Sequence, residues 1–230
     1  MSNQYGPRIV TDGLVLCLDA GNGKSYPGTG TNWYDLLGNN NGVLINGPVY
    51  NQSNRGILNI DGTDDRIDIA YSSTNFINAN FTWILWFIGL PNNNGPMPIF
   101  GYGSGAWPRL GIRYNNYWIF SQYGSDGTGN IDVYFSAVGS NTKWYCLAIT
   151  ADYTNRTIKT YTNGVLSNTT NNWRDSTGNT GNLGLGRAGS TSWPNAVLSG
   201  SVASFSIYSR ALTSSEILQN YNATKGRFNL

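Results

Sequence analysis

Short runs of β-branched and aromatic residues alternate with clusters of Gly, Asn, Asp and Pro along most of the chain. Runs of about four to eight such residues, bounded by turn-forming residues, are typical of strands. They predict strands at 14–19, 43–50, 56–60, 66–70, 81–89, 98–102, 109–114, 117–122, 131–136, 143–151, 156–162, 165–168, 183–187 and 200–208. Because no amphipathic helix separates these runs, we predict an all-β fold of two antiparallel sheets packed face to face.

Two Asn-containing turns are predicted between these strands. Asn163-Gly164 is a strong signal for a two-residue hairpin, since both residues tolerate the positive φ angles that this turn requires. Asn115-Asn116 predicts a second turn, before the strand that contains Trp118.

One helix is predicted near the C-terminus, over residues 213–223. Thr213 and Glu216 have the spacing of a capping box, in which each side chain accepts a hydrogen bond from the other residue's amide. Glu216 is the only glutamate of the chain, and this cap gives it a structural role. Ile217, Leu218 and Tyr221 would form the stripe that packs on the sandwich.

No linker, charge block or repeat divides the 230 residues, so a single domain over 1–230 is expected. Residues 1–12 are interpreted as an N-terminal arm and residues 224–230 as a short tail.

The charge balance and the lack of histidine exclude several classes of function and catalytic site. The chain has 14 basic and 12 acidic side chains and no histidine. The net charge of +2 is too small to indicate a nucleic-acid partner. Without histidine, Ser-His-Asp and Cys-His catalytic arrangements and His-based zinc sites are excluded.

The N-terminal residues do not resemble a signal peptide, and the longest apolar stretch, 81–90, is too short for a membrane helix. We therefore expect no membrane insertion. Cys17 and Cys146 each lie inside an apolar run and are interpreted as buried free thiols in preference to a disulfide.

The densest acidic cluster holds Asp61, Asp64, Asp65 and Asp68, and the first three are the candidate metal ligands. Oxygen-rich loops of this kind suit calcium, and Asp19 or backbone carbonyls could complete the ligand set. The alternative is an ordinary turn that enters a strand, with Arg66 neutralising its neighbours. The acidic cluster is thus either a structural calcium site or an ordinary turn. We expect no other cofactor.

Aromatic side chains in Gly- and Asn-rich loops form a second candidate site. Flat aromatic faces beside amide and hydroxyl groups suit sugars, although Trp and Tyr also serve in cores and subunit interfaces. The candidate glycan-binding residues are Tyr102, Trp107, Trp173, Arg174 and Trp193. Trp83, Trp86 and Trp144 lie in strand-like runs, so we interpret them as packing residues.

Several stretches, in order along the chain, resemble the laminin-G-like, concanavalin A-like jelly-roll family, especially versions from tailed phages and other aquatic viruses. They are residues 24–36, Asn46-Gly47-Pro48, 60–65, 81–83, 144–164 and 206–221. The resemblance implies a concanavalin A-like jelly-roll sandwich with one short C-terminal helix. Two departures matter: Ala203 stands where the family often has an acidic residue, and the acidic strand of the related glucanases has no match.

The resemblance implies a non-enzymatic virion surface protein, either a capsid decoration (cement) protein or a fibre or tail-tip head. Its partners would be the major capsid protein or tail and fibre proteins, together with a host surface glycan. Localisation would be the virion, after assembly in the host cytoplasm. By analogy with decoration proteins we expect a homo-oligomer, with a trimer favoured.

Two other functions remain as alternatives. The first is a lectin-like carbohydrate-binding module that is not tied to a virion. The second is a glycoside hydrolase that uses aspartates such as Asp64 and Asp68, because hydrolysis needs two carboxylates that flank the scissile bond.

Overall fold

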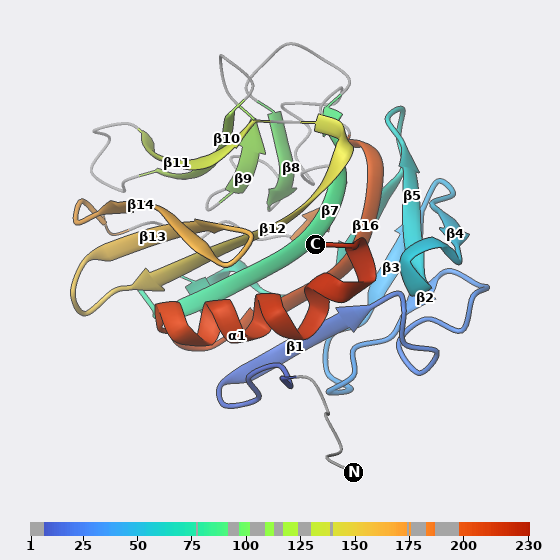
Figure 1. The fold of residues 1–230 in the computed structure, drawn as a ribbon, viewed down its shortest axis with the longest axis horizontal. Helices are drawn as coiled ribbons and strands as arrows, with labels where there is room; N and C mark the ends of the chain where they lie inside the picture. The colour runs from blue at the N-terminus through green and yellow to red at the C-terminus, as the bar shows by residue number, and fades with distance from the viewer. Residues whose placement is uncertain are drawn as a thin grey trace.

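The computed structural model describes residues 7–76, 78–91, 97–101, 109–112, 117–123, 130–138, 140–173, 175, 183–186 and 198–230. These residues form two antiparallel sheets that pack face to face (Figure 1). The two-sheet fold predicted from the sequence is confirmed, as is the C-terminal helix.

The first sheet, sheet A, has the strand order β14-β13-β12-β7-β16-β5-β4, and β1 also pairs with β16. Its strands are β1 (Leu14–Asp19), β4 (Val49–Asn51), β5 (Ile57–Asp61), β7 (Phe81–Pro91), β12 (Ser140–Asp152), β13 (Thr157–Thr162), β14 (Val165–Thr170) and β16 (Leu198–Tyr208).

The second sheet, sheet B, has the order β11-β10-β9-β8-β15-β6-β3-β2. Its strands are β2 (Asn32–Trp33), β3 (Gly42–Ile45), β6 (Arg66–Ile69), β8 (Met97–Gly101), β9 (Arg109–Ile112), β10 (Tyr117–Tyr123), β11 (Asn130–Val138) and β15 (Leu183–Leu185).

The predicted strand at 43–50 is two strands that belong to different sheets. β3 ends at Ile45, and Asn46 and Gly47 then adopt positive φ angles of 66° and 117°. This turn carries the chain from sheet B to β4 of sheet A. The sequence prediction merged the two strands because apolar residues stand on both sides of the turn.

The sequence of strand β7 is almost continuously hydrophobic because the strand is buried on both faces. Trp83, Leu85 and Phe87 belong to the core between the sheets. Ile84 and Trp86 alternate with them and belong to a second apolar cluster on the outer face of sheet A. Since side chains alternate between the faces of a strand, a strand buried on both faces loses the polar alternation.

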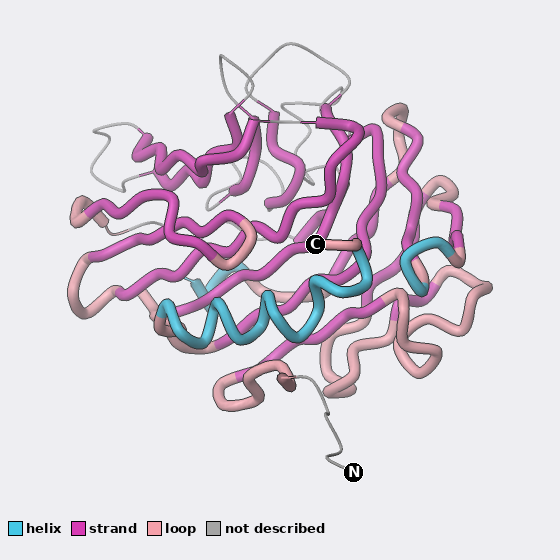
Figure 2. The backbone as a smooth tube through the Cα atoms, in the orientation of Figure 1, coloured by secondary structure: helices cyan, strands magenta, loops and turns pink. Residues whose placement is uncertain are grey.

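The C-terminal segment covers the outer face of sheet A (Figure 2). Helix α1 (Ser214–Thr224) begins with the predicted capping box between Thr213 and Glu216, and Ile217 is buried beneath it. Leu218, expected in the buried stripe, is 44% exposed. Tyr221 stacks on Trp86 with ring centroids 5.8 Å apart.

The segment interpreted as a tail is docked on the same face. It forms the 3-10 helix η4 (Lys225–Phe228), and the Phe228 ring stacks on Trp86 with centroids 4.2 Å apart. Two further 3-10 helices are η1 (Ser53–Arg55) and η2 (Ser73–Phe76). In the N-terminal segment, the Val10 amide donates to the side chain of Asn220 in α1.

One of the two predicted turns and both cysteines can be placed. Asn163 and Gly164 join β13 to β14 with φ angles of 51° and 80°, as the hairpin prediction requires. Asn115-Asn116 lies outside the described residues. Cys17 and Cys146 are buried free thiols, and burial raises the pKa of Cys17 to about 11. None of the helices described is long and apolar enough to cross a bilayer.

Candidate functional site

Three of the four predicted calcium ligands lie together. Asp61 ends β5, and Asp64 and Asp65 precede β6. One carboxylate oxygen from each residue lies within 4.8 Å of the other two. Asp61 and Asp64 are exposed, whereas Asp65 is 5% exposed. These are hard oxygen ligands of the kind that calcium takes, and calcium needs about six to eight of them.

Backbone amides fix this acidic loop. The Thr63 amide donates to Asp61 Oδ1 over 2.7 Å, and this bond lowers the pKa of Asp61. Asp65 Oδ2 accepts from the Asp61 amide over 3.1 Å, while burial raises the pKa of Asp65. Calcium at this loop stays a prediction.

One expectation about this loop needs correction. Asp19 does not join the cluster, because its Oδ1 accepts from Arg227 Nη1 over 2.7 Å at the end of β1. Arg66 lies 3.1 Å from Asp68 and forms an ion pair with this neighbour, as the interpretation of the loop as an ordinary turn expects.

Among the predicted glycan-binding aromatics, Trp173 can be placed, and it lies in the core. Its side chain is 4% exposed and meets the edge of Phe81 at 5.8 Å between ring centroids. The Trp173 amide donates to the carbonyl of Arg156, which ties this segment to the β12–β13 turn. Its ring face is therefore taken by core packing. Tyr102, Trp107, Arg174 and Trp193 lie outside the described residues.

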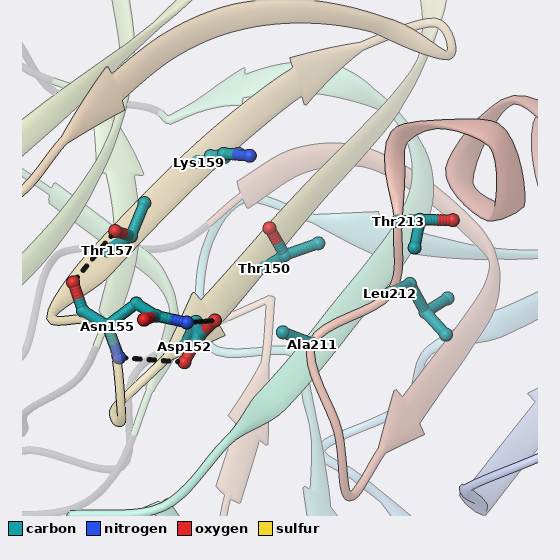
Figure 3. A pocket seen from close by; sticks show the side chains of 8 residues that line it. All are labelled: Thr150, Asp152, Asn155, Thr157, Lys159, Ala211, Leu212 and Thr213. Carbon is teal, nitrogen blue, oxygen red and sulfur yellow. Dashed lines mark hydrogen bonds between the residues drawn. The ribbon is translucent and has the colours of Figure 1, made fainter.

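A polar cleft of about 340 Å³ lies beside β12 and β13 (Figure 3). These two strands pair Thr150 with Lys159 and Asp152 with Thr157, so the four side chains share one face of sheet A. The opposite wall is the segment from Ala211 to Thr213, which joins β16 to α1. The complete lining is Thr150, Asp152, Asn155, Thr157, Lys159, Ala211, Leu212 and Thr213.

The turn between β12 and β13 closes one end of the cleft. Asp152 accepts from the Asn155 amide over 3.0 Å and from the Asn155 side chain over 2.8 Å. The side-chain hydrogen bond is the main reason that the pKa of Asp152 is lowered. Asp152 therefore stays a carboxylate at neutral pH and can still accept from a ligand.

The opposite wall is fixed by one buried hydroxyl. Thr82 on β7 is fully buried, and its Oγ1 donates to the carbonyl of Arg210 over 2.8 Å. The same oxygen accepts from the Leu212 amide over 2.9 Å. Both bonds anchor the 210–212 segment to the sheet, so the wall does not depend on a ligand for its position.

A model of the concanavalin A-like lectin/glucanases superfamily matches residues 61–218, well over half of the chain. The chain belongs to this superfamily. No curated protein has a sequence that matches the chain.

Solved structures with this concanavalin A-like fold include two toxin domains and a sialidase. The binding domain of Paraclostridial mosquitocidal protein 1 has a TM-score of 0.72 and 18% identity, over 92% of this chain and 52% of that one. The receptor-binding domain of botulinum neurotoxin type G has a TM-score of 0.67 and 16% identity, over 92% and 51%. Trypanosoma rangeli sialidase has a TM-score of 0.66 and 18% identity, over 97% and 36%.

At such identities the similarity shows the fold alone. The chain spans about half the length of the toxin domains and about a third of the sialidase.

The cleft of this concanavalin A-like domain combines an ammonium, a carboxylate, an amide and hydroxyl groups with an apolar wall at Ala211 and Leu212. Sequence reasoning did not find this cleft, because its two walls come from segments that are far apart in the chain. One local signal was present: Asp152 and Asn155 flank a short turn, where an Asp side chain commonly accepts from a following amide.

Proposed function

We propose that this chain is a non-enzymatic glycan-binding adhesion module. The observation that carries the proposal is the open polar cleft on rigid strands of a lectin-type fold. A sugar offers hydroxyl groups that pair with Asp152, Asn155 and Thr150, and an apolar C–H face that can contact Leu212. Sites of this composition, mainly preformed and with a few placed polar groups, are typical of small-ligand binding.

A glycan array probed with the full chain tests this function. The informative variant is Thr150→Val, since Thr150 is 4% exposed on the cleft floor and valine keeps its shape and strand preference. Loss of one neutral hydrogen bond should weaken the best glycan by about 2- to 10-fold.

Thr142→Val is the matched control, because exposed Thr142 stands at the other end of β12. An array on which the wild-type chain binds nothing contradicts the proposal. Equal weakening by both threonine variants contradicts the assignment to the cleft.

The absence of catalysis is part of the proposal. The lone glutamate, Glu216, is held in the helix cap and by Arg210, whose Nη2 lies 2.6 Å from Glu216 Oε1. Asp68 is paired with Arg66. We expect no polysaccharide cleavage by the wild-type chain or by Asp64→Asn; cleavage that Asp64→Asn abolishes would instead support an aspartate-based hydrolase.

We further propose that the module is displayed on a virion, as a capsid decoration or a fibre or tail-tip head. The support is the resemblance of residues 24–36, 60–65 and 206–221 to viral jelly rolls. Mass spectrometry of purified particles should detect the chain. Its absence from them would leave a glycan-binding module that acts without a virion.

A further inference from the structure

The polar cleft has a positive end and an acceptor end. Lys159 and Asp152 stand at opposite ends, with Thr150 between them on the floor (Figure 3). Because Thr150 pairs with Lys159 and Asp152 pairs with Thr157, Lys159 and Asp152 are diagonal neighbours on adjacent strands. The backbones of such neighbours lie about 7–8 Å apart, a separation that long side chains can bridge and that a small ligand can also span.

Asp152 and Lys159 differ in the hydrogen bonds and ion pairs that they form with described residues. Asp152 accepts two hydrogen bonds from Asn155 within its own turn. Lys159 is partly buried, and none of the ion pairs formed between described residues includes it. The charge of Lys159 contributes to the lowered pKa of Asp152, and its ammonium group can donate to an anionic group of a ligand, while Asp152 can accept from ligand hydroxyls.

We infer that the cleft binds a sugar that carries one carboxylate, with the carboxylate at Lys159 and ring hydroxyls at Asp152 and Thr150. This inference rests on the proposed glycan-binding function. A hexuronic acid carries its carboxylate on one side of the ring and hydroxyls on the other, which matches the two ends of the cleft. The volume of about 340 Å³ is near the lower end for small-molecule sites and suits a terminal sugar unit.

The charge arrangement distinguishes this ligand from others. A neutral sugar can donate hydrogen bonds to Asp152 but offers no anionic group to Lys159, whose ammonium then stays hydrated. A carboxylate adds a charge-assisted hydrogen bond, which is about twice as strong as a neutral one. A sugar with anionic groups on both sides meets repulsion from Asp152, so a single carboxylate fits best.

Calorimetric titration of the full chain with matched pairs of methyl glycosides tests the inference. The pairs are galacturonic acid with galactose, and glucuronic acid with glucose. We expect at least one uronate to bind about 10- to 100-fold more tightly than its neutral partner, and high salt to weaken the uronate selectively. Lys159→Gln should abolish this preference, so that the uronate and its neutral partner bind with similar affinity.

Lys143→Gln is the control, since Lys143 lies on β12 outside the cleft and is exposed. Equal affinity for uronate and neutral sugar, or equal effects of Lys159→Gln and Lys143→Gln, overturns the inference. The glycan-binding proposal survives either result if Thr150→Val still weakens binding. If neither the monosaccharides nor the glycan array shows binding to the wild-type chain, both proposals fail.

Discussion

Glu216 shows how one side chain can serve two structural purposes. Its carboxylate accepts from the Thr213 amide over 2.8 Å and completes the cap of α1. It also receives two hydrogen bonds from Arg210, of 3.0 Å and 2.6 Å. The Arg210 hydrogen bonds are the main cause of its pKa, which is lowered from 4.5 to about 2.

This pKa predicts a specific pH dependence. Since the folded-state pKa lies below the unfolded value, the stabilisation by Glu216 is present above about pH 4.5 and is lost as the pH falls toward 2. Glu216→Gln can retain the capping box but loses the charge, so it should lower the free energy of unfolding at pH 7 by about 1 kcal/mol.

Urea unfolding of wild type and Glu216→Gln at several pH values measures this effect. The gap between the two proteins should close as the pH approaches 2. A gap that stays constant from neutral to acidic pH would show that the charge on Glu216 contributes nothing.

Local signals explain what the sequence predicts at this scale. The capping box of Thr213 and the hairpin at Asn163 each depend on residues within one turn. Both can therefore be predicted from the sequence, and both are confirmed. The ion pair between Arg227 and Asp19 joins residues 208 positions apart, so no short sequence pattern predicts it. The incorrect assignment of Asp19 to the acidic cluster has this cause.

Among the strands, β7 and β16 leave no room for a side chain at a pair of facing glycines. Gly89 lies opposite Gly200. A Cβ added at Gly200 would overlap the carbonyl oxygen of Ile88, and one at Gly89 would overlap that of Ser199. Only residues without a side chain allow these two central strands to pair there.

Gly200→Ala should therefore destabilise the domain by about 2 kcal/mol or more, because strand backbones must separate to accept the methyl group. Gly226→Ala is the control, since no atom lies within 4 Å of a Cβ added there. Denaturant unfolding compares them. Equal stability of the two variants would mean that the strands separate without cost at this position.

The loop between β5 and β6 yields a prediction about calcium. If Asp61, Asp64 and Asp65 hold the ion, calcium at a hundredfold excess over its Kd adds about 2.7 kcal/mol to the free energy of unfolding. Thermal unfolding in calcium, in magnesium and with a chelator measures the shift, which Asp64→Asn should remove. Identical melting temperatures in calcium and chelator would identify the loop as an ordinary turn.

For the whole molecule, the strand pattern predicts the sandwich well but says little about how its segments meet. Every predicted strand has a counterpart, although the run at 43–50 divides into β3 and β4. The cleft depends instead on the contact of β12 and β13 with Ala211–Thr213, which the tertiary fold alone creates. Trp173 was expected on a loop surface because its neighbours are polar, yet the fold places it in the core.

The oligomeric state of the chain is a further prediction. By analogy with symmetric decoration proteins, we expect the chain to form a cyclic homo-oligomer, with three copies favoured. Light scattering of the purified chain over a range of concentrations measures the mass in solution. A constant mass near the 25.1 kDa of one chain, without attachment to particles, would contradict this expectation.

The two hydrogen bonds of Thr82 have a kinetic consequence. They fix one wall of the cleft in advance, and paired strands fix the floor. Encounter with a sugar then requires no closing step of these walls, and little entropy is lost in ordering them. Association rates should therefore vary little among sugars, and the lifetime of each complex should determine which glycan the domain retains.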